Sequence, residues 1–188
     1  MRTVGGRHRG RALSGLGGGD TTARLRPTSD RVRESLFNLL AHGGYGTPPP
    51  PEGQRVLDLF AGTGALGLEA LSRGATHATF VETGKTSLAI LRENAALLGE
   101  GNTSRVLPRD ATKPGENSGD PFGMVFLDPP YGRALGERAL EAVLTGGWLA
   151  PDALIVWEEN TALNPPSGLT LRDERRYGDT VISIFRRT

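Results

Sequence analysis

The stretch LDLFAGTGALG, residues 57–67, decides the fold that this sequence predicts. Gly62, Gly64 and Gly67 are spaced as G-x-G-x-x-G, directly after a short apolar run and at the start of a helical pattern. Glycines let the backbone turn sharply and come close to a ligand, and the free N–H groups at the start of the helix meet the ligand's polar groups. The stretch therefore predicts a strand, a ligand-binding turn and a helix.

Outward from this stretch, apolar runs typical of buried strands alternate with helical patterns. The strand-like runs cover residues 55–60, 78–82, 105–108, 123–128 and 153–159, and the helical patterns cover residues 65–74, 86–99 and 136–147. This alternation favours a doubly wound α/β fold, with a parallel sheet covered by helices on both faces.

The end of the chain has a different pattern. Residues 169–185, LTLRDERRYGDTVISIF, look like two strands joined tightly around Tyr177, Gly178 and Asp179. We therefore expect a mostly parallel sheet, seven-stranded in all, whose last strand is antiparallel to its partner.

The length of 188 residues suits one domain with a core of its own. Residues 1–27 are rich in glycine and arginine and predict a basic hairpin or mobile arm, with GLGGGD (residues 15–20) as its turn. Residues 28–188 are expected to form a single domain. We divide it into an amphipathic helix (28–41), a proline- and glycine-rich linker (42–53) and the α/β core (54–188).

Charge is unevenly distributed along the chain. Residues 1–33 contain eight arginines against two aspartates, so this segment carries +6 although the whole chain carries only +1. Such a segment can neutralise phosphates, which makes nucleic acid the expected partner, and a solvated tail is the alternative.

Composition excludes several kinds of chemistry and location. The chain has no cysteine, which rules out disulfides, thiolate metal sites and a cysteine nucleophile, and its three histidines are scattered. We therefore expect no metal site. No apolar run is long enough to span a bilayer and the N-terminus does not resemble a signal peptide, so a cytoplasmic location without membrane attachment is expected.

Two carboxylates flank the glycine turn. Glu82 lies at the end of the second apolar run, where it can accept hydrogen bonds from ribose hydroxyls. A nucleoside-containing cofactor is indicated, and both a nicotinamide dinucleotide and S-adenosylmethionine fit this feature. Asp58 lies within the first apolar run, where a buried charge needs a partner. It favours the cationic S-adenosylmethionine over a pyrophosphate, although a hydrogen bond to its own turn is compatible with either.

A second chemical motif is DPPY, residues 128–131, at the end of the fourth apolar run. An exocyclic amine on a base is a poor nucleophile, so an enzyme must hold its hydrogens with acceptors. The Asp128 carboxylate and the Pro129 carbonyl can be those acceptors, while Pro130 stiffens the loop and Tyr131 offers a face for stacking. The alternative is that Asp-Pro-Pro merely bends the chain out of the sheet.

A third carboxylate, Asp110, follows the third apolar run and is a candidate contact for an adenine amino group. A turn residue is the alternative at this position. Asn94, Trp157 and Glu158 receive no functional assignment from the sequence, and Trp157 is most simply a core residue.

The sequence resembles the bacterial small-subunit ribosomal RNA methyltransferase D family. The resemblance rests on GGRHRGRAL, RPTSDRVRESLFNLL, VLDLFAGTGALGLEALSRGA, FVE, DPPY and YGDT, and it runs nearly the whole length of the chain. It implies a Rossmann-like class I methyltransferase that transfers a methyl group from S-adenosylmethionine to N2 of a guanine in 16S rRNA. It also implies a small ribosomal subunit or its precursor as the partner, and we expect a monomer.

The resemblance also implies roles for individual residues. Cofactor binding falls to Asp58, Gly62, Thr63, Gly64, Glu82 and Asp110, with Glu82 at the ribose and Asp110 at the adenine. The target guanine is held by Asp128, Pro129, Pro130 and Tyr131. RNA contacts fall to Arg7, Arg9, Arg11, Arg26, Arg31 and Arg33.

Other functions remain open from the residues alone. A DNA adenine or protein glutamine N-methyltransferase can share a similar Pro-Pro-aromatic site. A nicotinamide-dependent oxidoreductase shares the glycine turn, although so short a chain leaves little room for a substrate domain. An RNA-binding assembly factor without catalysis is a further alternative.

Overall fold

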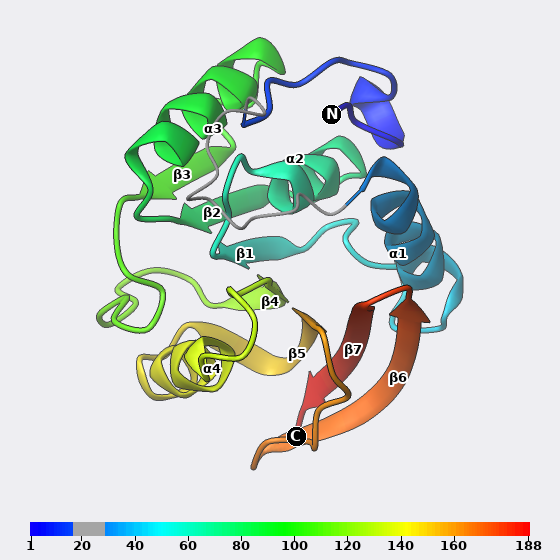
Figure 1. Ribbon diagram of the computed structural model, residues 1–188, viewed down its shortest axis with the longest axis vertical. Coiled ribbons are helices and arrows are strands. Elements are labelled where there is room, and N and C mark those ends of the chain that lie inside the picture. The colour runs from blue at the N-terminus through cyan, green and yellow to red at the C-terminus, as the bar shows by residue number, and fades with distance from the viewer. Residues whose placement is uncertain (17–28) are drawn as a thin grey trace.

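The computed structural model describes residues 1–16 and 29–188. Its elements, shown in Figure 1, are η1 (Gly6–His8), α1 (Asp30–His42), β1 (Arg55–Leu59), α2 (Ala65–Ser72), β2 (His77–Val81), α3 (Lys85–Leu97), β3 (Ser104–Leu107), β4 (Phe122–Leu127), α4 (Leu135–Thr145), β5 (Leu149–Glu159), β6 (Leu169–Tyr177) and β7 (Thr180–Arg187). In the described part of the chain, no helix has the length and apolar character needed to cross a bilayer.

One sheet organises the fold, with strand order β3-β2-β1-β4-β5-β7-β6. Strands β1 to β5 pair in parallel, whereas β7 runs antiparallel to both β5 and β6. The predicted seven-stranded, mostly parallel sheet with an antiparallel last strand is confirmed. The strand order reverses between β1 and β4, and ligands of doubly wound sheets bind beyond the carboxyl ends of the strands at such a switch.

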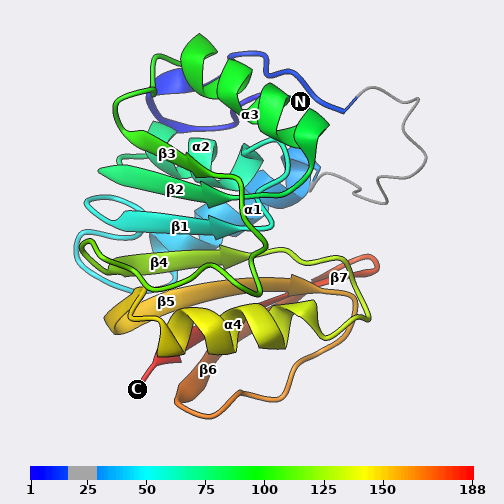
Figure 2. The same ribbon diagram turned by 90° about the vertical axis from the view of Figure 1, so that its left-hand side faces the viewer.

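The core lies in two layers, one on each face of the sheet. On one face, residues of α1, α2 and α3 pack against Val56, Phe80, Phe126 and Val156. On the other face, α4 packs against the residues that alternate with these, which include Leu57 and Val125. Figure 2 shows α4 in front of the sheet and α1 behind it. Each central strand is buried on both sides, which is why the strands read as continuous apolar runs.

The segment between α1 and β1 contains neither helix nor strand, as its prolines and glycines predict. It nevertheless packs closely against the sheet. Tyr45 is buried, and its hydroxyl donates a hydrogen bond of 3.1 Å to Asp173 of β6. Burial and the nearby Asp173 charge raise the pKa of Tyr45 to about 12. The predicted linker is therefore a packed connection.

The N-terminal residues form a small hairpin whose turn contains η1. Arg2 forms an antiparallel bridge with Ala12, and the Leu13 amide donates a hydrogen bond of 2.9 Å to the Met1 carbonyl. The hairpin docks on the end of α2, because the Ser72 hydroxyl donates a hydrogen bond of 2.6 Å to the Gly5 carbonyl. The turn that we predict at residues 15–20 lies largely outside the described residues.

Candidate active site

The glycine turn joins β1 to α2. Gly62 and Gly64 have φ of +56° and +82°, a left-handed region in which residues with a side chain are strained. Gly67 is required for a different reason, since a Cβ there would lie 2.3 Å from the Phe80 ring. A Cβ on Gly62 would meet no atom within 4 Å, so this glycine borders open space. Backbone shape and close packing together explain the three glycines.

Asp58 lies beneath this turn and is 1% exposed. Its Oδ2 accepts a hydrogen bond of 2.9 Å from the Gly67 amide, so the carboxylate fastens the first turn of α2 to β1. Burial raises the pKa of Asp58 to about 8; the Gly67 hydrogen bond lowers it and the Glu82 charge raises it further. In the described part of the chain, no cationic side chain pairs with Asp58. Its environment would suit a positively charged ligand group.

Glu82 is held by backbone amides at the carboxyl end of β2. Its Oε2 accepts a hydrogen bond of 2.7 Å from Gly62, and its Oε1 accepts bonds of 2.7 Å from both Thr83 and Gly84. Three amides therefore fix the carboxylate beside the glycine turn. A carboxylate oxygen has more than one lone pair, so these bonds leave it able to accept further ones.

Four carboxylates lie on one face of the sheet, at or just beyond its carboxyl edge. They are Asp58, Glu82, Asp128 and Glu158, and each follows by two positions a core residue of the layer formed with α1, α2 and α3. Those core residues are Val56, Phe80, Phe126 and Val156. Side chains two apart on a strand share a face. Asp58 pairs in register with Phe80 and Phe126, which precede Glu82 and Asp128 by two positions. Asp58 therefore lies farther from the carboxyl edge of the sheet than the other three carboxylates.

Asp128 opens the DPPY loop, which leaves the sheet at the end of β4. The last register pair between β4 and β5 is Leu127 with Trp157, so Asp128 and Glu158 follow side by side. No group among the described residues donates a hydrogen bond to the Asp128 carboxylate. Burial, followed by the charges of Glu158, Asp58 and Glu159, raises its pKa well above the ordinary carboxyl value.

Tyr131 is partly exposed and is fixed through its hydroxyl. It donates a hydrogen bond of 2.9 Å to Oε1 of Glu158, and the Thr180 hydroxyl lies 3.5 Å away. Burial is the largest cause that raises the pKa of Tyr131 above its usual range. The side chain is 37% exposed, which leaves part of the ring accessible. Sequence reasoning missed Glu158, although a carboxylate in the apolar run of β5 was a signal for it.

Asp110 lies beyond β3 and is exposed. Its Oδ1 accepts hydrogen bonds of 2.8 Å from both the amide and the hydroxyl of Thr112. These two bonds are the main causes that lower the pKa of Asp110. Asp110 therefore stabilises its own turn, which is the alternative role that we considered, and it uses one of its two carboxylate oxygens to do so.

The predicted RNA-binding arginines differ in their surroundings. Arg7 pairs with Glu100 at 2.5 Å, and a guanidinium nitrogen of Arg11 donates a hydrogen bond of 3.3 Å to the Leu97 carbonyl. Arg9 and Arg31 are exposed. Arg26 lies outside the described residues.

The prediction that Arg33 contacts RNA is wrong. Arg33 is fully buried, where its guanidinium lies 2.8 Å from Asp30 and 3.8 Å from Glu69. It also donates a hydrogen bond to the Arg2 carbonyl. Arg33 shares the inner face of α1 with Leu36 and other buried residues. Its charge therefore pairs with groups inside the protein and does not face solvent.

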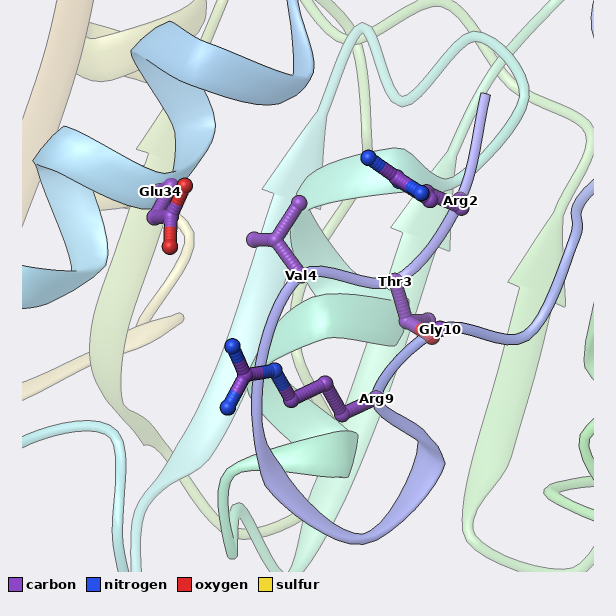
Figure 3. A pocket seen from close by; sticks show the side chains of 6 residues that line it. All are labelled: Arg2, Thr3, Val4, Arg9, Gly10 and Glu34. Carbon is purple, nitrogen blue, oxygen red and sulfur yellow. The ribbon is translucent and has the colours of Figure 1, made fainter.

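A pocket of about 230 Å³ lies between the N-terminal hairpin and α1. Figure 3 shows its lining, which consists of Arg2, Thr3, Val4, Arg9, Gly10 and Glu34. Arg2 and Arg9 come from the two arms of the hairpin, and Glu34 comes from α1. The pocket lining thus contains both positively and negatively charged side chains.

The strand order, the glycine turn and the carboxylates at the carboxyl edge define a Rossmann-like α/β fold of the methyltransferase kind. The model of the family described as Conserved hypothetical protein 95 matches residues 1–186, and the chain belongs to this family.

Curated relatives and solved structures agree with this assignment. Ribosomal RNA small subunit methyltransferase D of Escherichia coli K12 is 40% identical over 190 residues, covering 100% of this chain and 90% of that protein. The Haemophilus influenzae protein of the same name is 38% identical over 192 residues, covering 99% and 93%. The solved structure of yhhF from E. coli superposes with a TM-score of 0.82 at 38% identity, covering 100% of this chain and 97% of that one.

Proposed function

We propose that this protein transfers a methyl group from S-adenosylmethionine to the exocyclic N2 amine of a guanine in 16S rRNA. The substrate is the small ribosomal subunit or its assembly intermediate, and the enzyme acts as a monomer in the cytoplasm. One observation carries the proposal: Asp128 and Tyr131 follow β4 on the same sheet edge as the glycine turn of β1 and its carboxylates. The names of the relatives support the choice of substrate.

The residues at the glycine turn fit S-adenosylmethionine. Asp58 is a buried carboxylate without a cationic partner among the described residues, and the ligand carries positive charge. Gly62, Thr63 and Gly64 would hold the methionine end, because Gly62 borders open space. Glu82 would accept hydrogen bonds from the ribose hydroxyls, and Asp110 would contact the adenine amine through the oxygen not used by Thr112.

The DPPY loop would hold the target base. When bound, S-adenosylmethionine supplies an electrophilic methyl group. The Asp128 carboxylate and the Pro129 carbonyl accept the hydrogens of the amine and orient its nitrogen. Burial and neighbouring carboxylates raise the pKa of Asp128, so in its ionised form it would be a stronger base than a surface aspartate and would take up the proton that the amine loses.

The arginines of the hairpin and α1 would contact the RNA backbone. Exposed arginines of the hairpin and α1 are Arg7, Arg9, Arg11 and Arg31, and Arg26 would extend this set. Such contacts are sequence-independent and weaken as salt increases. The DPPY loop, by contrast, would select the base.

The decisive experiment is incubation of the protein with methyl-labelled S-adenosylmethionine and small ribosomal subunits from a strain that lacks the enzyme. Nucleoside analysis should find the label at N2 of guanosine. Label in adenine of DNA or in protein glutamine would identify the rival methyltransferases, and the absence of label from guanosine N2 would refute the proposal.

Cofactor affinity should depend on pH through Asp58. Its pKa of about 8 in the free protein means that below pH 8 the carboxyl holds a proton, which a cationic ligand group must displace. We therefore expect S-adenosylhomocysteine, which keeps the ammonium group, to bind about tenfold more weakly at pH 6 than at pH 7. Calorimetry measures this difference.

The matched control is Asp58→Asn, which keeps an acceptor for the Gly67 amide but does not titrate. Its affinity should be nearly constant between pH 6 and 8. A wild-type protein whose affinity follows the same flat profile would contradict a role for ionised Asp58 in binding.

A further inference from the structure

Glu158 is a buried carboxylate that the proposed chemistry leaves without a role. It lies near the end of β5 and is 7% exposed. Burying a charged group costs free energy, since desolvation disfavours its ionised form. Its place in the register is next to Asp128, directly beyond the pair Leu127 and Trp157.

Glu158 is also hydrogen-bonded to Tyr131, the residue on whose ring a base would stack. The Tyr131 hydroxyl donates a hydrogen bond of 2.9 Å to its Oε1, and Thr180 approaches the same hydroxyl from the start of β7. The charge of Glu158 is, after burial, the largest influence on Asp128. Two acceptor groups therefore stand side by side at the DPPY loop, one from β4 and one from β5.

This pair of acceptors matches the edge of guanine. Guanine presents two neighbouring donors, the N1–H group and the N2 amine, whereas N1 of adenine is an acceptor. An ionised carboxylate only accepts hydrogen bonds, and its two oxygens can accept several. Glu158 can therefore keep its bond from Tyr131 and accept a second donor. An N1 lone pair opposite the carboxylate would instead be repelled.

We propose that Glu158 determines base specificity by accepting the N1–H of the target guanine while Asp128 accepts from the N2 amine. This inference rests on the proposed function, because it concerns the same site and substrate. It also explains the position of Tyr131. The ring that would stack on the guanine is hydrogen-bonded through its hydroxyl to Glu158, which would contact the N1–H edge of the same base.

The test replaces the target guanosine by 2,6-diaminopurine in reconstituted small subunits. This base keeps the 2-amino group but has an acceptor at N1. The wild type should prefer guanine by about 10²-fold or more in kcat/KM, because sites built to bind an N–H reject analogues that lack it. In Glu158→Gln the side-chain amide can donate to the new N1 acceptor, so the preference should fall to within about tenfold.

Tyr131→Phe is the matched control. It removes the hydrogen bond to Glu158 without changing the acceptor, so it should slow both substrates by a similar factor and leave their ratio unchanged. An undiminished guanine preference in Glu158→Gln would overturn the inference. A wild type that labels neither base would instead count against the proposed function, so the two failures are distinguishable.

Discussion

Replacing Asp128 with alanine should lower the single-turnover rate of methyl transfer about 10²–10³-fold, the scale for removing one preorganised polar contact at a reacting group. The carboxylate has no hydrogen-bond donor among the described residues, so its acceptor capacity is available to a substrate amine. Binding of S-adenosylhomocysteine and of small subunits should change little, because neither the glycine turn nor the exposed arginines contact Asp128.

Stability distinguishes this loss of activity from unfolding. The raised pKa of Asp128 means that the folded chain binds its proton more tightly than the unfolded chain. The wild type therefore loses stability as pH rises above the ordinary carboxyl value and through the raised pKa. Asp128→Ala escapes this loss, so its melting temperature at pH 8 should be no lower than that of the wild type.

Asp120→Ala is the matched control. Asp120 is an exposed carboxylate shortly before β4, at the opposite end of this strand from the DPPY loop. Its removal should leave the rate within about twofold, as expected for a surface change of no more than ~0.5 kcal/mol. An Asp128→Ala protein that methylates at the wild-type rate would contradict the catalytic assignment.

Much of the site could be predicted because its residues follow strands. Asp58 and Glu82 flank the glycine turn in the sequence, and the shared carboxyl edge of parallel strands brings Asp128 to them. Glu158 could not be placed in this way. Its relation to Asp128 depends on the register between β4 and β5, which is a long-range pairing that no local pattern encodes.

In the N-terminal region, contacts between residues far apart in the sequence decide the structure, so local sequence features were a poor guide. The described hairpin turns at η1, where contacts with Ser72 fix it. The turn predicted at the glycine cluster of residues 15–20 lies largely outside the described residues. Arg33 was assigned by charge although it precedes Leu36 and Phe37 by three and four positions, the spacing of a shared helix face. Its buried partner Glu69 belongs to another helix, and that pairing is not visible locally.

Replacing Arg33 with methionine should destabilise the fold by about 3–5 kcal/mol, because it leaves a buried carboxylate without one of its cations. Glu69 is fully buried, and it also accepts hydrogen bonds from Arg73 at 2.7 Å and from the Val4 amide at 2.8 Å. Urea unfolding measures the change. Arg31→Met is the control, since Arg31 is exposed on the same helix and its removal should cost no more than ~0.5 kcal/mol.

The double variant Arg33→Met/Glu69→Leu tests the cause of this loss. Because both charges are then absent from the interior, it should recover a large part of the stability. The Val4 amide loses its acceptor, however, so the hairpin should exchange its amide hydrogens faster than in the wild type. If Arg33 instead served as an RNA contact, Arg33→Met would retain full stability and lower the affinity for small subunits, which is the reverse of what its burial predicts.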